Sequence, residues 1–306
     1  MPPSAFESPG AWLRCALHAH TTNSDGALPP DKLVSHYEWA GFDVLAITDH
    51  WVRTIEPSTD RLLVIPGAEL DGRVDGKGDA HVLALGLNAD PQLPETDALS
   101  LDEATEWVRG AGGVAFLAHT YWSGLRTEAF EACEGLAGLE VYNAACELEV
   151  GRGLASLHWD EVLEGRRMFL GLATDDTHHP GFDSSLAWVW ARCEERTAEA
   201  VLFALREGRF YSSTGPEIQD VKVTESDVEV RCSPARSITL LAGRMKGSSV
   251  NTGRLGYTIR SETLESDDRG LVTAARLERP AFTPYGRLEL RDDEGRRAWT
   301  NPLWVS

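Results

Sequence analysis

Histidine and acidic residues recur in this sequence of 306 residues at the points where apolar segments end. The first such segment ends in His18 and His20, which are separated by one residue, and Asp25 follows in a polar stretch. Alternate residues of a β-strand point to the same side, so the two imidazoles can face one cation. The next apolar segment ends in Asp49 and His50. Imidazole and carboxylate groups bind divalent metals, so this spacing indicates metal chemistry.

Three later apolar segments also end in possible metal ligands. Glu69 closes one segment, His119 closes another, and Asp176 and His178 follow a third. His81 departs from this pattern, because it precedes its apolar segment and must reach the site from a loop or from the start of a strand. The active sites of parallel α/β barrels lie at the C-terminal ends of the strands, so we expect these side chains to meet there. Nitrogen and oxygen donors without Cys suit Zn, Mn or Fe.

The segments that must position these residues have the pattern of an α/β protein up to about residue 214. Short, largely apolar stretches predict buried strands at 12–17, 43–48, 62–65, 81–86, 113–118, 138–142, 168–173 and 186–193. Helical patterns lie between them, beginning after residue 29, at residue 100 and at residue 197, with another over 154–164. Alternating strands and helices predict a parallel sheet or barrel, and seven or eight repeats favour a barrel.

The pattern changes near residue 215, where apolar and polar residues begin to alternate, starting with Val221 and Val223. We therefore expect a barrel domain over 1–214 and a small antiparallel β domain over 215–306. The charge changes at the same place. Residues 1–214 hold 15 basic and 34 acidic residues, whereas residues 215–306 hold 14 of each, so the net charge of −19 belongs wholly to the first domain.

The composition excludes several classes of protein. With 42% apolar and 25% charged residues, the chain is typical of folded soluble proteins. Its acidity is unfavourable for polymeric nucleic acid, and it lacks the basic face of a membrane-surface protein. The acidic excess serves solubility, and some of its carboxylates can face bound cations. Five scattered Cys residues, no secretory signal and no apolar run of membrane-spanning length lead us to expect a cytoplasmic protein. Nothing in the sequence indicates an oligomeric state.

The motifs HxH, TDH, GxE, AH and DxH, in this order over residues 12–214, resemble the polymerase and histidinol phosphatase (PHP) superfamily of metal-dependent hydrolases. The resemblance implies a distorted (β/α)7 barrel with two or three divalent metal ions. The spacing of DxH selects Asp176 over Asp175. The ligands implied by the motifs are His18, His20, Asp25, His50, Glu69, His81, His119, Asp176 and His178. Residues 210–216 and the β tail also resemble the branch that includes carbamate-insecticide hydrolases.

The expected reaction is hydrolysis of a phosphate ester of a small molecule by a metal-bound hydroxide. Glu69 is the expected bridge between two metals, because a carboxylate offers one oxygen to each. Asp176 or His178 would orient the hydroxide or protonate the leaving group. Asp49 and Asp175 would orient metal-binding imidazoles from outside the ligand set, a supporting role that is as well founded as a catalytic one.

Candidate substrate-binding residues follow the metal motifs in the chain. A phosphate substrate favours nearby cations, and only Arg53 and Arg126 are well placed in the sequence. Tyr121, Trp122 and Asn143 could line the pocket. This scarcity of basic residues leaves open a carbamate or carboxyl-ester hydrolase on the same metals. A non-catalytic, metal-loaded binding module is a further alternative, whereas the acidic charge disfavours a proofreading exonuclease.

Overall fold

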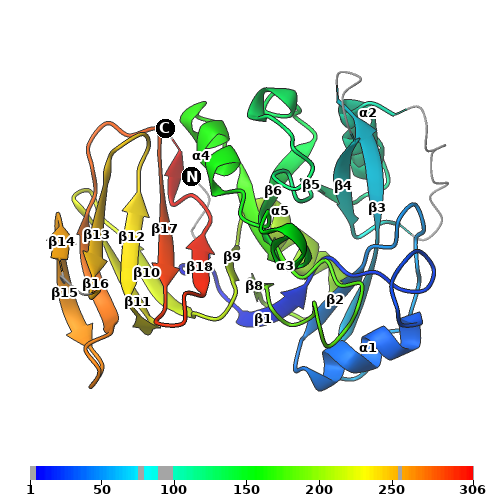
Figure 1. Cartoon of the computed structure of the whole chain (residues 1–306), viewed down its shortest axis with the longest axis horizontal. Helices are drawn as coiled ribbons and strands as arrows, with labels where there is room; N and C mark the ends of the chain where they lie inside the picture. The colour runs from blue at the N-terminus through cyan, green and yellow to red at the C-terminus, as the bar shows by residue number, and fades with distance from the viewer. Residues whose placement is uncertain (1–4, 75–78, 89–98, 254–256, 306) are drawn as a thin grey trace.

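The computed structural model of the protein describes residues 5–74, 79–88, 99–253 and 257–305 (Figure 1). Its α/β part is built on a sheet with the strand order β9-β8-β1-β2-β3-β4-β5-β6-β7. These strands are β1 (Ala11–Ala16), β2 (Val44–Ile47), β3 (Leu63–Arg73), β4 (Asp79–Leu85), β5 (Val114–Leu117), β6 (Leu136–Asn143), β7 (Leu170–Thr174), β8 (Trp188–Cys193) and β9 (Phe210–Ser213). The eight predicted strands correspond to β1–β8, and β9 is an addition.

The sheet is not uniformly parallel, which corrects one part of the expectation. Strands β1, β2 and β3 run parallel, and so do β5, β6 and β7. Strand β4 is antiparallel to both of its neighbours, and β8 is antiparallel to β1 and β9. The physical reason at β4 is the connection: β3 continues to Arg73 and β4 begins at Asp79, which leaves too few residues for a crossover helix.

The two ends of this curved sheet, β7 and β9, meet through a side chain. The backbone N–H of Ala173 donates to Ser212 Oγ over 2.9 Å, and Ser212 Oγ donates to the carbonyl of Gly171 over 2.8 Å. The interior is filled by apolar side chains, among them Leu17, Phe116 and Leu172. The result is the predicted distorted barrel, which is closed by Ser212.

The described helices of the α/β part are α1 (Pro30–Trp39), α2 (Leu101–Gly110), α3 (Ala144–Val150), α4 (Ser156–Glu164) and α5 (Ala198–Glu207), with a 3-10 turn at Thr127–Ala129. Helix α2 begins with the predicted capping box, in which Ser100 and Glu103 bond to each other's backbone. Helix α5 ends at Gly208, whose φ of 68° suits glycine. None of the helices in the described ranges is long and apolar enough to cross a membrane.

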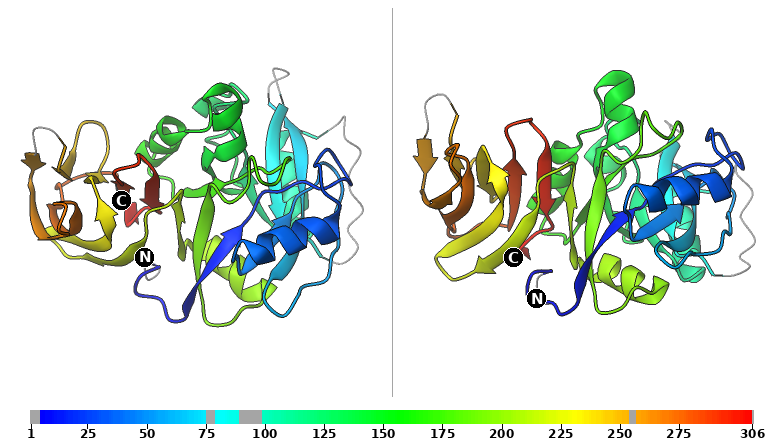
Figure 2. Two further views of the ribbon diagram at one scale, coloured as in Figure 1. Left: turned by 60° about the horizontal axis from the view of Figure 1, so that its bottom comes forward. Right: turned by 90° about the horizontal axis from the view of Figure 1, so that it is seen from below.

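The C-terminal strands form two antiparallel sheets that lie at one end of the molecule, drawn yellow to red in Figure 2. The strands are β10 (Ile218–Val223), β11 (Asp227–Ala235), β12 (Ser237–Leu241), β13 (Gly247–Asn251), β14 (Tyr257–Ile259), β15 (Ser261–Ser266), β16 (Val272–Glu278), β17 (Tyr285–Arg291), β18 (Arg297–Thr300) and β19 (Trp304–Val305). One sheet is β10-β11-β16-β15; the other continues the barrel sheet, because β18 pairs with β9. The domain boundary at residues 214 and 215 stays a prediction.

Candidate metal centre

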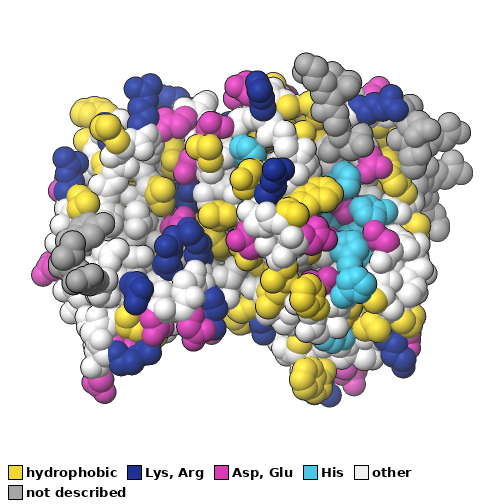
Figure 3. All heavy atoms as spheres, in the orientation of Figure 1, with side chains coloured by type: hydrophobic (Ala, Val, Ile, Leu, Met, Phe, Trp, Pro, Cys, Tyr) yellow, Lys and Arg dark blue, Asp and Glu magenta, His cyan; other side chains and the backbone are white. Residues whose placement is uncertain are grey.

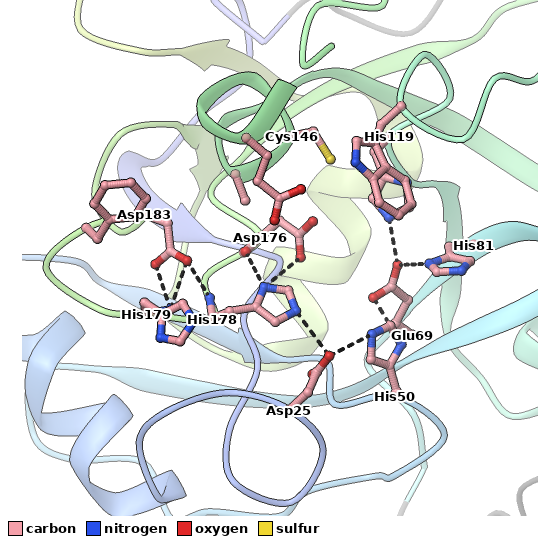
Figure 4. A pocket seen from close by; sticks show the side chains of 14 residues that line it. Asp25, His50, Glu69, His81, His119, Cys146, Asp176, His178, His179 and Asp183 are labelled. Carbon is pink, nitrogen blue, oxygen red and sulfur yellow. Dashed lines mark hydrogen bonds and ion pairs between the residues drawn. The ribbon is translucent and has the colours of Figure 1, made fainter. Parts of the chain in front are cut away.

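The nine ligands that the motifs imply lie at or beside one cavity of about 340 Å³, at the end of the barrel where the parallel strands terminate, and Figure 4 shows those that line it. Seven of them line the cavity: Asp25, His50, Glu69, His81, His119, Asp176 and His178. The other two, His18 and His20, are fully buried beside it. In the space-filling view, histidine side chains form a continuous stripe on this face of the molecule, with acidic side chains next to it (Figure 3).

Glu69 lies at the centre of the group, and one of its oxygens faces three imidazoles. Its Oε2 is 3.1 Å from Nε2 of His18 and 3.2 Å from Nε2 of His20. The same oxygen is 3.4 Å from Nδ1 of His50. Glu69 is 1% exposed, so it is a buried carboxylate that would be costly to place without cationic partners.

The other oxygen of Glu69 faces two further imidazoles. Its Oε1 is 2.9 Å from Nδ1 of His81 and 3.1 Å from Nε2 of His119. Because β4 is antiparallel, the start of this strand lies at the same end as the C-terminal ends of its neighbours, which explains how His81 reaches the site. Asp71, which the sequence reasoning missed, lies 3.3 Å from Nε2 of His81 and fixes the orientation of that ring.

Asp176 is the second buried carboxylate of the centre. Its Oδ1 is 3.1 Å from Nε2 of His18 and 3.3 Å from Nε2 of His20, yet this buried atom accepts no hydrogen bond. Asn143 donates to the other oxygen, Oδ2, over 3.1 Å. The φ of Asp176 is 57°, a left-handed backbone conformation that is uncommon for a non-glycine residue and is typical of functional positions.

Asp25 joins the centre from the loop after β1. Its Oδ2 lies 3.5 Å from Nε2 of His178 and 3.6 Å from Nε2 of His50, and its Oδ1 lies 3.5 Å from Nδ1 of His20. With 53% of its side chain exposed, Asp25 is on the solvent side of the cavity. The loop is therefore the open edge of the centre, whereas Glu69 and Asp176 form its floor.

These residues form three overlapping donor groups, in each of which the donor atoms lie within 4.8 Å of one another. The groups are His20, Asp25, His50 and His178; His18, His20, Glu69 and Asp176; and His50, Glu69 and His81. Zinc with bonds of about 2.0–2.1 Å places tetrahedral ligands about 3.4 Å apart, which matches the separations above. Oδ1 of Asp176 is buried without a hydrogen-bond partner, as expected for an oxygen that would bind a metal ion. The donor set thus fits divalent cations.

The protonation of the centre follows from its charges. Burial alone would raise the pKa of Glu69, but the imidazoles of His18 and His119 hold it well below its usual range. Burial alone would lower the pKa of His20, but the neighbouring carboxylates of Asp176 and Glu69 raise it to about 9. The pKa of His18 is raised in the same way by Asp176, Glu69 and Glu140, so without cations the protons of these two imidazoles would compensate the buried carboxylates. Divalent metals would replace those protons in the same place.

Glu140 is the most important residue that the sequence reasoning missed. It is fully buried in β6, and its Oε1 accepts from Nδ1–H of His18 over 2.8 Å. Its Oε2 accepts from the backbone N–H of His119 over 2.8 Å and from Asn143 over 2.9 Å. This carboxylate fixes the tautomer of His18 so that Nε2 faces the cavity. The available signal was a lone acidic residue inside an apolar strand.

The two acids that were expected to orient imidazoles hold loops in place. Asp49 accepts from the backbone N–H of Thr21 over 2.6 Å and from Ser24 over 2.8 Å, so it shapes the loop that carries Asp25. Asp175 accepts three backbone N–H groups of residues 185–187 and the hydroxyl of Tyr37. Burial raises the pKa of Asp175 to about 6. Both residues therefore position the candidate ligands indirectly, by fixing the backbone of loops near them.

Asp183, which was also missed, anchors the loop after β7. Its carboxylate accepts from the backbone N–H of His178 over 2.8 Å and from that of His179 over 2.8 and 3.0 Å. Figure 4 shows Asp183 on the opposite side of Asp176 from His119. The loop is a compact turn, because the backbone N–H of Phe182 donates to the carbonyl of His179 over 2.9 Å.

Of the four expected substrate-binding residues, one lies directly beneath the cavity and three lie outside its described lining. Asn143 is buried beneath the cavity, where it contacts Glu140 and Asp176 and caps α3. Arg53, Arg126 and Tyr121 are not among the described residues that line the cavity. Their roles in substrate binding stay predictions.

The outer lining of the cavity includes Trp122, Glu149 and Phe182, together with Ala145 and Cys146 of α3. Trp122 packs edge-on against the ring of His119, with the ring centroids 5.1 Å apart. None of the described lining residues is Lys or Arg. The cavity therefore joins a polar floor of candidate metal ligands to an outer part that includes aromatic side chains.

Comparison with solved structures gives a match over the whole chain. A two-domain protein from Bacteroides vulgatus, described as containing a predicted PHP-like metal-dependent phosphoesterase, has 16% identity and a TM-score of 0.53, and the match covers 99% of each chain. The Bacteroides protein and this chain have the same fold. No family model and no curated protein matches the sequence. The PHP-like architecture expected from the motifs, a barrel followed by a β domain, is thus confirmed at the level of fold.

Two other solved structures match part of the chain. An amidohydrolase from Chromobacterium violaceum, with bound sulfate and no metal, has 19% identity and a TM-score of 0.42, and the match covers 55% of this chain and 89% of that one. PsfC from Pseudomonas syringae has 13% identity and a TM-score of 0.44, and the match covers 63% of this chain and 88% of its own.

Proposed function

We propose that this protein is a metal-dependent hydrolase that cleaves phosphate esters of small molecules. The observation that carries the proposal is the pair of buried carboxylates, Glu69 and Asp176, whose oxygens lie 2.9–3.4 Å from imidazole nitrogens at the cavity. The fold shared with the two-domain Bacteroides protein supports the same conclusion.

The three donor groups would hold two or three divalent ions, with Mn, Zn or Fe as the candidates. Glu69 belongs to two of the groups and offers a different oxygen to each side, as a bridging carboxylate does. When bound, such ions activate a water molecule and neutralise the charge of a phosphate. All the remaining roles in the proposal fall to the residues of the chain.

In the proposed reaction, water adds to phosphorus and the bond between phosphorus and the alcohol oxygen breaks. The alcohol leaves with one proton, and inorganic phosphate is the other product. Asp176 and His178 line the cavity, and we assign them to orienting the attacking water and to protonating the departing oxygen. His178 donates from Nδ1–H to the carbonyl of Asp176 over 2.9 Å, which turns its Nε2 towards Asp25 and the open side.

The imidazoles are pre-oriented by groups behind them. Nδ1 of His18 is held by Glu140, Nδ1 of His119 lies 3.1 Å from Ser123 Oγ, and Nδ1 of His20 lies 3.3 Å from Ser24 Oγ. Each Nε2 therefore faces the cavity. Fixed donors lower the reorganisation that binding and catalysis require, which favours a catalytic centre over a loosely arranged surface site.

A carbamate or carboxyl-ester hydrolase is the second candidate, and one observation favours it. The described lining of the cavity has no Lys or Arg, and a neutral ester needs no cationic clamp beside the metals. A metal-loaded binding module without catalysis is the third candidate. The three candidate functions use the same metal centre. They differ in the molecule that binds there and in whether it is hydrolysed.

The experiment that separates them is a product-release screen with the purified chain supplied with Mn, Zn or Fe. We expect phosphate release from small phosphate esters, with no release after chelation and at least a hundredfold loss of kcat/KM in His18→Ala and His20→Ala. Phenol release from aryl carbamates without phosphate release would instead establish the second candidate. Metal-replete protein that turns over neither series would contradict the hydrolase proposal.

A further inference from the structure

The outer part of the cavity has features that bear on the alcohol portion of the substrate. Trp122 follows His119 in the loop after β5, and 41% of its surface is exposed. Phe182 belongs to the turn after β7, and 70% of its surface is exposed. Both are large apolar side chains that remain accessible to solvent and line the same cavity as the metal-binding residues.

These two side chains come from different loops that border the cavity, the loop after β5 and the turn after β7. Trp122 packs on His119, and Phe182 is the neighbour of Asp183 in the chain; Figure 4 shows His119 and Asp183 on either side of Asp176. Both supports are fixed. Asp183 is bound to the backbone of the turn, and His119 is held through its own backbone N–H by Glu140. The aromatic walls are therefore attached to the same rigid elements as the metal-binding groups.

The charge of the lining is one-sided. Five carboxylates line the cavity: Asp25, Glu69, Glu149, Asp176 and Asp183. Three of them belong to the donor groups, and Asp183 accepts from backbone N–H groups. Glu149 is exposed on α3 and adds negative charge to the outer part, where no described lining residue is Lys or Arg. Bound cations would neutralise one anionic group at the floor, but the outer part repels a second one.

We propose that the substrate carries an aromatic group without negative charge on its leaving alcohol, and that this ring binds between Trp122 and Phe182. The inference rests on the proposed hydrolase function and specifies the substrate class of the same site. Aromatic rings bind well to aromatic walls in edge-on or offset contacts. A volume of about 340 Å³ is near the lower end of the range for ligand pockets, about 300–1,000 Å³, and suits a single ring with one phosphate.

The test compares three phosphate monoesters: benzyl, ethyl and 4-carboxybenzyl phosphate. Benzyl alcohol and ethanol have similar acidity, so a difference in kcat/KM between their esters reports on ring binding. We expect the wild-type enzyme to prefer benzyl over ethyl phosphate by at least tenfold. We also expect it to disfavour 4-carboxybenzyl phosphate by at least tenfold relative to benzyl phosphate. The same series as N-methylcarbamates covers the second candidate function.

Variants assign the preference to the two walls. Trp122→Ala and Phe182→Ala should each lower the benzyl-to-ethyl ratio of kcat/KM by about tenfold, and Glu149→Gln should raise kcat/KM for the 4-carboxybenzyl ester. Trp39→Ala and Phe282→Ala are the matched controls, because these side chains are 88% and 100% exposed and lie outside the cavity lining. The controls should leave the ratio unchanged.

The outcomes separate the inference from the function on which it rests. If ethyl and benzyl esters are turned over equally, or if the ratio is unchanged in both wall variants, the hydrolase proposal stands and the aromatic subsite is wrong. If neither the phosphates nor the carbamates are turned over by metal-replete protein, both are wrong. The ratio is used because it cancels any general loss of activity in Trp122→Ala, whose indole contacts His119.

Discussion

The imidazole of His18 is bound on both sides, with Nδ1 at Glu140 and Nε2 at Glu69 and Asp176. The sequence could predict that most of the candidate ligands lie together, because they follow apolar segments that become neighbouring strands, and their role as metal ligands stays a prediction. The support from Glu140 could not be predicted, because this residue bonds to His18 and His119, which are distant from it in the sequence. The support from Asp183 could not be predicted either, because it depends on the conformation of the turn after β7. Asp176 could be chosen over Asp175 by spacing, and the structure gives the two neighbours different surroundings.

Glu140→Gln tests the support of His18. The amide keeps the volume but can present its NH2 group to Nδ1–H, so the tautomer and the ring position are no longer fixed. We expect metal affinity to fall about 10–100-fold, as when comparable partners of metal ligands are removed. Metal titration measures the change, and Glu134→Gln, at an exposed position before the same strand, is the control. Equal affinities in the wild type and Glu140→Gln would refute the assignment.

Asp175→Asn tests the loop anchor. Asp175 accepts three backbone N–H groups and one hydroxyl, and an asparagine places an NH2 group against some of these donors. We expect a loss of about 2 kcal/mol in the free energy of unfolding. Tyr37→Phe removes only the hydroxyl and should cost less, about 1 kcal/mol. Denaturant titration measures both, and an Asp175→Asn variant as stable as the wild type would be inconsistent with this role.

At the scale of elements, the predicted strands and helices were found, and the differences have identifiable causes. The strand containing Glu69 runs on to Arg73, although its last residues, Asp71 to Arg73, are polar and lack an apolar pattern. Helix α3 was missed because seven residues are too few for a periodic pattern, and its start depends on the cap from Asn143. The reversal of β4 depends on a short connection whose effect on direction is not visible in periodicity.

Gly26→Ala tests the loop that carries Asp25. A Cβ at Gly26 would lie 2.3 Å from the carbonyl oxygen of His20, a backbone atom, so the loop must shift. We expect the donor group of His20, Asp25, His50 and His178 to lose affinity, seen as about one metal ion fewer per chain. Gly110→Ala is the control, because its Cβ would meet nothing within 4 Å. Unchanged metal content in Gly26→Ala would show that the loop position does not matter for binding.

At the scale of the whole molecule, the C-terminal strands contact the barrel through strand pairing and a shared hydrophobic core, in addition to the covalent connection. Strand β18 pairs with β9, and Trp299 and Tyr285 are part of the hydrophobic core of the α/β part. The shift of pattern and charge near residue 215 could be read in the sequence. The shared sheet could not, because it depends on which distant strand lies beside β9, and local alternation carries no information about that neighbour.

Arg287→Ala tests this junction. Arg287 of β17 is fully buried and donates to both oxygens of Asp160 of α4, over 2.7 and 2.8 Å. Its removal would leave Asp160 without this partner at the junction, so we expect a loss of about 3 kcal/mol in the free energy of unfolding. Arg291→Ala, on the exposed end of the same strand, should change it by less than about 0.5 kcal/mol. Equal stabilities of the two variants would argue against a stabilising junction.

The most direct test of the central claim is the metal content of the purified chain. The chain is incubated with Mn, Zn or Fe and desalted, and its metal content is then measured by elemental mass spectrometry. The overlapping donor groups predict two or three ions per chain in the wild type. Glu69→Ala should retain at most one, because Glu69 belongs to two of the three groups. Fewer than two ions in the metal-replete wild type, or a full complement in Glu69→Ala, would contradict a multinuclear centre built around this carboxylate.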